Sequence, residues 1–265
     1  MRDLSSLIML LIISFVSCKK QSTNPPPPAS PGPTPTIYPC PTPNFTNAIN
    51  TNGIKLVKVW GSNTVSSTNW SRRTSFVYYD AFNRIINLKH WDTSQTSSGL
   101  VYKCAEDQYT YNSQGKVSTL ISYQNGSSVP TTSVTFFYNS VPQLTLDVTT
   151  RVASGSIDSA KYVYYTGKIE KNASSGQTVY FVNLTNNLDS LIYPSGTFSA
   201  YTYDGKLHPF KNLYSSFSPY KVDQNVVDIM DHNLNTLSTF SYTYNTNNLP
   251  LVGSRTGEIT YYFYE

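Results

Sequence analysis

Short tyrosine-rich units recur along the chain and constrain its fold more than any other feature of the sequence. In each unit a Tyr-x-Tyr or similar pair is followed by Asp or Asn, then by turn residues, a basic residue and an aliphatic residue. The two rings share one face of a strand because side chains alternate with period two, and Asp, Asn and Gly favour tight turns. Each unit therefore predicts a β-hairpin. Clear copies begin at Val77, Tyr109, Tyr201 and Tyr242, and looser copies at Phe136, Tyr162 and Phe181.

The repetition of these units predicts the fold class. A single hairpin is unstable alone, so neighbouring hairpins must pair into one sheet. Aromatic residues make up 14% of the chain, with 22 tyrosines, which suits half-buried strands. We expect an all-β domain over residues 44–265, an antiparallel meander of about 12 to 16 strands that forms a large twisted, curled or barrel-like sheet. Residues 223–231 alternate poorly and are interpreted as a strand with flanking turns.

The unit Tyr203-Asp204-Gly205-Lys206-Leu207 resembles the YD repeat of RHS-type proteins. Over residues 54–265 the layout is similar to a family of uncharacterised Bacteroidota lipoproteins with degenerate YD-like β-hairpin repeats. Residues 54–59 resemble the opening strand of that family, residues 203–210 its recurring unit, and Leu249-Pro250 followed by residues 259–265 its last hairpin. Because the family has no established activity, the resemblance implies a fold and an envelope location but no chemistry.

Residues 1–17 resemble a bacterial lipoprotein signal peptide. Residues 4–16 are almost wholly apolar, a run too short for the roughly 20 residues of a membrane span. The run ends in Phe15-Val16-Ser17-Cys18, which resembles the lipobox. This resemblance implies cleavage before Cys18, diacylglycerol on its sulfur and an acyl chain such as palmitate on its amino group, so that Cys18 anchors the protein to a membrane. An incidental thiol in a cleaved or membrane-spanning leader is the alternative.

Residues 18–43 are the predicted lipid anchor and tether. The segment is rich in proline, which favours an extended, semi-rigid spacer, and at about 3.1 Å per residue about twenty such residues reach roughly 60 Å. Lys19 follows the anchor in place of Asp, which favours the outer membrane, and the lack of acidic residues after it favours the periplasmic face. We therefore expect a cell-envelope protein that is lipid-anchored to the outer membrane and faces the periplasm rather than the cell surface.

Two cysteines follow the anchor, Cys40 and Cys104. An exported chain enters an oxidising compartment, so an even pair predicts a disulfide. Such a bond adds about 4 kcal/mol in the chain-entropy model. Two separate buried thiols are the alternative, because the sequence does not show whether the two positions come close.

The sequence contains no motif that predicts catalysis, a cofactor or a metal. His90, His208 and His232 lack the spacing of zinc ligands, and there is no nucleophile elbow, phosphate-binding loop or His-Glu-x-x-His motif. The net charge of +4 includes two tether lysines and no basic run, which gives no indication of nucleic-acid binding. We expect a monomer that is not an enzyme.

Aromatic side chains are the candidates for ligand contact. Strand tyrosines usually pack their rings and leave their hydroxyls in water, so sheet packing is the simplest interpretation. The alternative is a platform on which a glycan stacks, with contributions from Trp60, Trp70 and Trp91.

Two Asp-Ser sequences raise a separate possibility of modification. Ser159 and Ser190 each follow Asp and resemble the O-glycosylation signal of Bacteroidota proteins. Such a short pattern arises easily by chance in a serine-rich chain. Turn chemistry leading into a strand is the favoured interpretation.

The sequence leaves three functional classes open. The leading hypothesis is a non-catalytic envelope lipoprotein that binds or scaffolds an envelope protein or a glycan. The second is a carrier of an apolar ligand inside a curled sheet, which requires a large apolar cavity. The third is a glycan hydrolase, which requires two carboxylates in one cleft.

Overall fold

The computed structural model describes residues 55–66, 69–97, 99–222, 224–231 and 236–265. The predicted signal peptide, the tether and the domain boundary at residue 44 lie outside these residues. The regular secondary structure of the described residues is almost entirely strand, with one 3-10 helix (η1, Val152–Ser154) and one short helix (α2, Lys211–Tyr214). The strands are β1 (Leu56–Ser66), β2 (Asn69–Tyr79), β3 (Ile85–Thr96), β4 (Gly99–Tyr111), β5 (Val117–Gln124), β6 (Thr132–Tyr138), β7 (Leu144–Arg151), β8 (Ser156–Tyr165), β9 (Lys168–Ala173), β10 (Gly176–Val182), β11 (Leu188–Ile192), β12 (Phe198–Leu207), β13 (Gln224–Asp231), β14 (Thr236–Thr239), β15 (Ser241–Tyr244), β16 (Pro250–Arg255) and β17 (Glu258–Tyr264).

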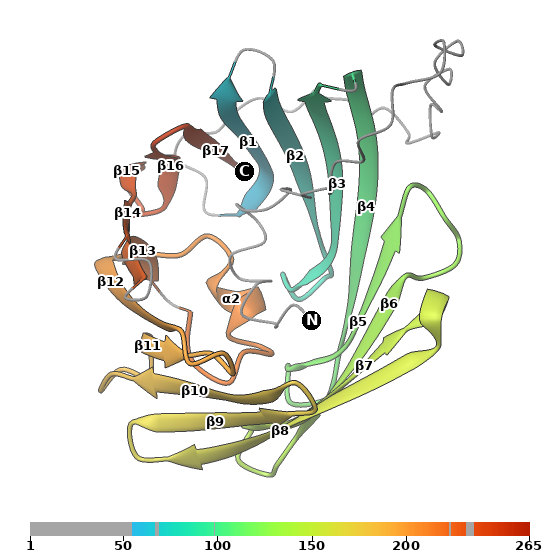
Figure 1. Cartoon of the computed structure of the whole chain (residues 1–265), viewed down its shortest axis with the longest axis vertical. Helices are drawn as coiled ribbons and strands as arrows, with labels where there is room; N and C mark the ends of the chain where they lie inside the picture. Colours follow the sequence, from blue (N-terminus) through green and yellow to red (C-terminus); the bar gives the residue numbers. More distant parts are fainter. Residues whose placement is uncertain (1–54, 67–68, 98, 223, 232–235) are drawn as a thin grey trace, which may run out of the picture. The chain divides into compact units, whose positions relative to one another are not determined.

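All seventeen strands belong to one antiparallel sheet that curls round on itself (Figure 1). From β1 to β14 each strand pairs with the next along the chain, β15 to β17 do the same, and β17 returns to pair with β1. Among the described residues no ladder joins β14 to β15, which only Phe240 separates. The sheet is therefore not closed, and its two edge strands are neighbours in the chain.

This architecture confirms the predicted all-β antiparallel meander. The strand interpreted over residues 223–231 is β13. The described residues form seventeen strands, one more than the upper limit of the prediction. The difference arises because residues 236–244 form two short strands in place of one: β14 pairs only with β13, and β15 pairs only with β16.

Asp and Asn side chains of the repeated units form the hairpin turns, as the sequence predicts. The Asn112 side-chain oxygen accepts the backbone N–H groups of Gln114 and Lys116, both at 3.0 Å. Such local bonds satisfy backbone donors that the turn leaves without a ladder partner. The same acceptor role falls to Asp80, Asn183 and Asn245, and the third residue after each of these four positions has a positive φ: Asn83, Gly115, Asn186 and Asn248.

In most units the second tyrosine ties its hairpin to the preceding one. The Tyr111 hydroxyl donates to the backbone carbonyl of Ile85, the first residue of β3, at 2.7 Å. The expectation that strand tyrosines leave their hydroxyls in water is wrong at these positions. Just before Tyr79, Tyr111, Tyr138 and Tyr203 a register shift aims the ring along the sheet. The corresponding pairs are Tyr79 with Leu56, Tyr138 with Val117, Tyr164 with Leu144, Tyr203 with Leu188 and Tyr264 with Pro250.

We expect Tyr111→Phe to lower the free energy of unfolding by about 1 kcal/mol, because it removes one hydrogen bond to a part-buried carbonyl and leaves the ring in place. Burial raises the pKa of Tyr111 to about 12, so the hydroxyl stays a donor at all ordinary pH values. Urea denaturation measures the loss. The control is Tyr165→Phe, whose exposed hydroxyl bonds Glu170 at 3.3 Å and should lose almost nothing. Equal losses in both variants would contradict this role.

The connection between β12 and β13 supplies much of the hydrophobic core. We call its residues 208–222 the plug; they include α2, which lies inside the curl of the sheet (Figure 1). The Phe217 ring lies 6.4 Å from Tyr109 and 5.5 Å from Phe136, and the Tyr220 ring lies 5.4 Å from Tyr180. The plug thus contacts inward-facing rings of β4, β6 and β10, strands that would otherwise enclose an apolar space.

Backbone hydrogen bonds fix the plug at the end of the sheet where the Asp and Asn turns lie. The Ser216 carbonyl accepts both the Val117 N–H at 3.2 Å and the Tyr138 hydroxyl at 3.0 Å. The Lys116 ammonium donates to the Ser215 carbonyl at 3.0 Å. These bonds satisfy buried polar groups of a segment that has almost no regular structure of its own.

We expect acid to destabilise the protein through His208, at the start of the plug. Burial lowers the pKa of His208 to about 4, below the roughly 6.5 of an unfolded chain. As the pH falls below 6.5, the unfolded chain binds a proton that the folded chain does not, so stability is lost. Between about pH 7 and about pH 5 the loss should be about 2 kcal/mol at most, since the ring is half-buried.

The matched variant for this prediction is His208→Asn. The Nδ1 atom of His208 accepts the Phe210 N–H at 3.1 Å, and an amide oxygen keeps an acceptor in the same place without titrating. Urea midpoints of the two proteins at about pH 7 and about pH 5 should diverge, with the variant losing less stability. Parallel losses would show that His208 is not the group responsible.

Candidate functional site

The three tryptophans of the chain lie on the outer face of three neighbouring strands. Val59, Ser75 and His90 are buried on the inner face of β1, β2 and β3. Since side chains alternate along a strand, Trp60 and Trp91 point outward. Both lie directly opposite Thr74 of the central strand β2, and Trp70 precedes Thr74 by four residues on the same face. The structure therefore brings together the three predicted ligand-contact residues.

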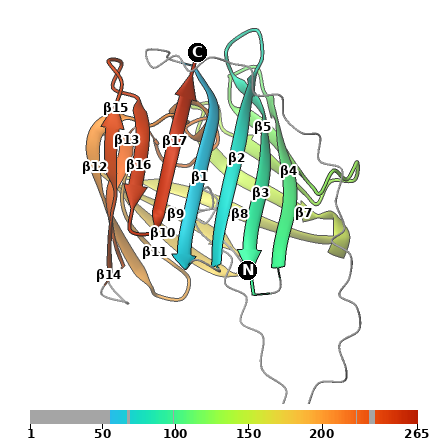
Figure 2. The same ribbon diagram turned by 90° about the horizontal axis from the view of Figure 1, so that it is seen from above.

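Other aromatic and cationic groups complete this surface. Trp60 lies 5.5 Å from Tyr261, and Trp91 meets Phe76 edge-on at 5.1 Å. The Arg72 guanidinium lies over the Trp70 ring at 4.7 Å. Such contacts hold the half-buried rings in fixed positions, so that each keeps part of its surface available. We call the outward side chains of Trp60, Trp70, Arg72, Phe76, Trp91, Tyr102 and Tyr261 the aromatic face; its strands lie side by side in Figure 2.

Hydrogen-bonding groups alternate with the rings on the aromatic face. Thr93 of β3 lies between Arg72 and Tyr102 in one cross-strand row, and Gln95 lies between Trp70 and Leu100 in the next. Tyr102 is 51% exposed, the most open ring of the face. Rings that present a flat apolar surface next to hydroxyl and amide groups match the chemistry of a sugar, which has apolar C–H faces and a rim of hydroxyls.

A carboxylate with amide neighbours lies beside the aromatic face. Glu106 of β4 accepts hydrogen bonds from the amides of Asn87 and Gln108 and lies 3.6 Å from the Lys89 ammonium. Burial opposes its ionisation, but these hydrogen bonds and the lysine charge outweigh burial, and the pKa of Glu106 lies below its ordinary value. Glu106 is therefore a fixed anionic acceptor on the outside of the sheet.

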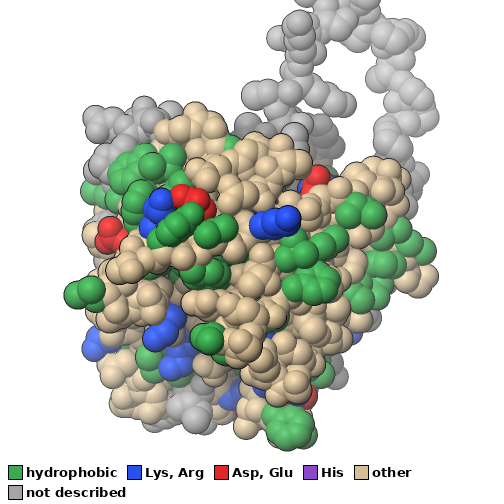
Figure 3. All heavy atoms as spheres, turned by 90° about the horizontal axis from the view of Figure 1, so that it is seen from below, with side chains coloured by type: hydrophobic (Ala, Val, Ile, Leu, Met, Phe, Trp, Pro, Cys, Tyr) green, Lys and Arg blue, Asp and Glu red, His purple; other side chains and the backbone are tan. Residues whose placement is uncertain are grey.

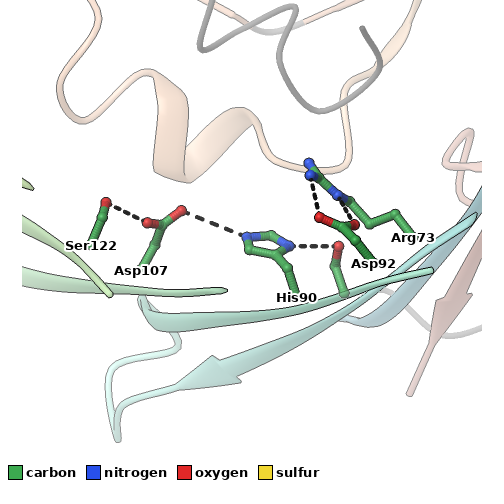
Figure 4. Close-up of polar contacts among 6 residues, drawn as sticks. Arg73, His90, Asp92, Asp107 and Ser122 are labelled. Carbon is green, nitrogen blue, oxygen red and sulfur yellow. Dashed lines mark hydrogen bonds and ion pairs between the residues drawn. The ribbon is translucent and has the colours of Figure 1, made fainter. Parts of the chain in front are cut away.

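A second polar arrangement lies on the inner face of the same strands (Figure 4). Arg73 forms two hydrogen bonds to Asp92, at 2.6 and 2.8 Å. Farther along, Ser75 lies 2.8 Å from His90 Nδ1, and His90 Nε2 lies 3.6 Å from Asp107. Ser122 completes this polar row by donating to Asp107 at 2.6 Å.

The polar row has the residue types of a hydrolase but not the geometry. Ser75 is 1% exposed, so its hydroxyl is out of reach of a substrate. Asp107 lies opposite Leu88, four residues along β3 from Asp92, so the backbone positions of the two carboxylates are roughly 13 Å apart along the strand. Paired glycosidase carboxylates lie about 5–9.5 Å apart. The polar row is best understood as a network that satisfies buried polar groups.

Of the predicted cysteines, only Cys104 lies within the described residues. It lies on β4 directly opposite Trp91 and is disulfide-bonded. Because Cys18 and Cys40 lie outside the described residues, lipidation at Cys18 and the pairing of Cys40 with Cys104 stay predictions. His232 also lies outside them. Within the described part of the chain, no group of three or more His, Cys, Asp or Glu side chains could hold a metal ion.

The interpretation of both Asp-Ser sequences as turns is wrong. Ser159 lies within β8 opposite Val148, and Ser190 lies within β11 between its partners Phe181 and Ala200. The two sites differ in access: the Ser159 side chain is exposed, whereas Ser190 is 7% exposed. Modification of the folded domain could therefore reach Ser159 but not Ser190.

The opposite side of the curled sheet has a different surface. Figure 3 shows that this side is largely uncharged and polar, with small separate groups of hydrophobic side chains. The exposed hydrophobic residues of β8 are Ile157, Val163 and Tyr165. Tyr165 therefore offers an exposed aromatic control away from the aromatic face.

Sequence reasoning found the tryptophans of the aromatic face but missed their neighbours. Phe76 and Tyr102 belong to β2 and β4, and alternation from Trp70 would have placed Phe76 on the same face. Tyr102 and Tyr261 required the pairing registers β3–β4 and β1–β17, which no local pattern encodes.

No family model and no curated protein matches the chain. Among solved structures, the chain is similar to a porin-like protein from Bacteroides uniformis, with a TM-score of 0.54 and 10% identity, covering 80% of this chain and 98% of that chain. At this identity the likeness shows a shared fold alone. The described residues include no helix with the length and apolar character needed to cross a membrane.

Proposed function

We propose that the protein is a non-catalytic, lipid-anchored module of the cell envelope that binds a glycan on its aromatic face. One observation carries the proposal: all three tryptophans lie on the outer face of three adjacent strands, interleaved with hydroxyl and amide groups. A folded protein gains little from placing its tryptophans outside its core, whereas a ligand that stacks on them gains both apolar contact and fixed orientation.

The proposed location in the cell envelope is supported by the predicted signal peptide and tether. The lipobox-like Phe15–Cys18 supports attachment to a membrane, and the proline-rich segment supports a reach of tens of ångströms from it. The resemblance to YD-repeat lipoproteins and the shared fold with a protein described as porin-like are consistent with this location. Between the two membranes, the glycan strands of peptidoglycan lie within this reach.

The interior of the sheet favours the binding module over the two other functional classes. A carrier needs an apolar cavity, yet the plug places Phe217 and Tyr220 against the inward rings of the sheet. A hydrolase needs converging carboxylates, and the inward carboxylates Asp92 and Asp107 are each held by other side chains. A ligand that stacks on the outer face needs neither an empty interior nor a free pair of carboxylates.

We expect Trp70→Ala to weaken glycan binding about tenfold, since loss of a stacked ring costs on the order of 1–1.5 kcal/mol. Isothermal titration with soluble muropeptide fragments measures the affinity. Trp70 is the test position because it is half-buried near the start of β2, where its removal disturbs the core least. Tyr165→Ala, on the far side of the sheet, should bind like the wild type; an equal loss there would count against the aromatic face.

A further inference from the structure

Arg72 lies at the centre of the aromatic face, between the three tryptophans. It belongs to the central strand β2, two residues after Trp70 and two residues before Thr74. Trp60 and Trp91 lie directly opposite Thr74 on the two neighbouring strands. They are therefore diagonal neighbours of Arg72, about 7–8 Å away, a distance within reach of long side chains. A positive charge is thus flanked by three large rings.

The guanidinium of Arg72 is exposed and is oriented by one of these rings. It lies over the Trp70 ring at 4.7 Å, and Arg72 is one of the exposed residues of β2. A guanidinium that lies over an aromatic ring keeps the N–H donors at its outer edge available, and their planar fork matches the two oxygens of a carboxylate. The contact with Trp70 therefore leaves Arg72 able to form hydrogen bonds with a ligand.

The cross-strand neighbours of Arg72 on this face carry no negative charge. Its direct partners are Ser62 on β1 and Thr93 on β3, and Tyr102 on β4 follows Thr93 in the same row. Their hydroxyl groups can donate hydrogen bonds to an anion but cannot balance the charge of the arginine. The row therefore presents one positive charge with hydrogen-bond donors on both sides of it.

Glu106 is too far from Arg72 to balance its charge. It lies two strands across and four residues along the sheet, which places the two backbone positions about 16 Å apart. Glu106 is also engaged by the Lys89 ammonium and by two side-chain amides. The other acidic residues in the described strands β1 to β4 and β17 alternate onto the inner face: Asp92, Asp107 and Glu258. Within these strands, the charge of Arg72 is therefore unmatched on the outer face.

We propose that Arg72 binds a carboxylate of the ligand, so that the aromatic face selects an acidic glycan, one built from sugars that carry a carboxylate. The inference rests on the proposed glycan-binding function and names the class of glycan. A sugar acid has its carboxylate at the rim of the ring, among its hydroxyls. When the sugar stacks on the tryptophans, this group reaches the guanidinium, and the hydroxyls of Ser62 and Thr93 can donate to it. A neutral sugar leaves the arginine without a counter-charge, and this difference gives the selectivity.

Isothermal titration of the full-length protein tests the inference with two probes: an oligogalacturonate, and the same oligosaccharide after reduction of its carboxylates to alcohols. The wild type should bind the acidic form about tenfold more tightly, because charge-assisted hydrogen bonds are the stronger kind. Arg72→Gln should bind both forms as the wild type binds the neutral one. Arg72→Lys keeps the charge but not the fork, so its preference should be intermediate.

The matched control is Lys161→Gln, which removes an exposed cation from the outer side of β8 and should keep the full preference. Equal affinities of the wild type for the two forms, or a preference that survives in Arg72→Gln, would overturn the inference. An equal loss of both forms in Arg72→Gln would also overturn it, because the arginine would then only position the Trp70 ring. In each of these cases, binding that Trp70→Ala weakens would still support the proposed function. If the wild type bound neither form, this inference would be overturned, and retention on the cell's own glycans would decide the proposed function separately.

Discussion

Replacing Phe217 with alanine is expected to lower the free energy of unfolding by about 3–5 kcal/mol, the largest stability effect of any single substitution considered. Phe217 is 3% exposed, and its ring contacts those of Tyr109, Phe136 and Tyr214. Removing it leaves a cavity where the plug meets the inner face of the sheet. Urea or thermal denaturation followed by near-ultraviolet circular dichroism, which reports on packed aromatic rings, measures the loss.

The matched control is Phe137→Ala. Phe137 belongs to β6 next to Phe136, but its side chain points outward and is exposed. A loss below about 1 kcal/mol is expected there. If the two variants lost similar stability, the plug would not be part of the core, and the interior of the sheet would have to be filled in another way.

Cys18→Ala is expected to move the protein from the membrane fraction to the soluble fraction. The predicted anchor carries more than one acyl chain, and each buried methylene contributes about 0.8 kcal/mol, so its loss removes essentially all membrane affinity. Cell fractionation with metabolic labelling by palmitate measures both location and lipid.

Cys104→Ser is the control for the anchor, because it removes a cysteine from the β domain and leaves Cys18 in place. This variant should stay in the membrane fraction and keep its label. Retention of Cys18→Ala in the membrane fraction, with or without label, would contradict the predicted lipoprotein anchor.

The hairpins could be predicted from sequence because their signals are local. Each Tyr-x-Tyr pair and the Asp or Asn after it lie within five residues of each other, and the structure places the units at Val77, Tyr109 and Tyr242 at strand ends that are followed by turns. The unit at Tyr201 is the exception, because it lies within β12. The register shifts before Tyr79, Tyr111, Tyr138 and Tyr203 were not predictable, because a bulge depends on the partner strand. Without them the tyrosine hydroxyls would not reach the backbone of the preceding hairpin.

The plug could not be predicted because its contacts are distant in sequence. The sequence of residues 203–210 predicts one more hairpin unit. After Leu207, however, the chain passes into the interior of the curled sheet and packs against β4, β6 and β10. Its apolar residues Phe210, Leu213 and Phe217 follow no strand periodicity. These apolar residues fill the space that the curled seventeen-stranded sheet encloses. The size of that space depends on the whole fold and not on local sequence.

The candidate site was predictable as a set of residues but not as a surface. Tryptophan was singled out for its chemistry, whereas the common outward direction of Trp60, Trp70 and Trp91 depends on pairing registers. The same dependence explains why Ser159 and Ser190, with similar local sequences, differ in exposure.

The central claim, glycan binding on the aromatic face, is tested most directly by retention on envelope glycans. Purified wild-type protein is sedimented with intact peptidoglycan sacculi and passed over immobilised outer-membrane polysaccharide from the same cells. Trp70→Ala with Tyr102→Ala is compared with Tyr165→Ala. We predict that one of the two glycans retains the wild type and Tyr165→Ala but not the double variant. Equal retention of all three proteins, or retention of none on either glycan, would contradict the claim.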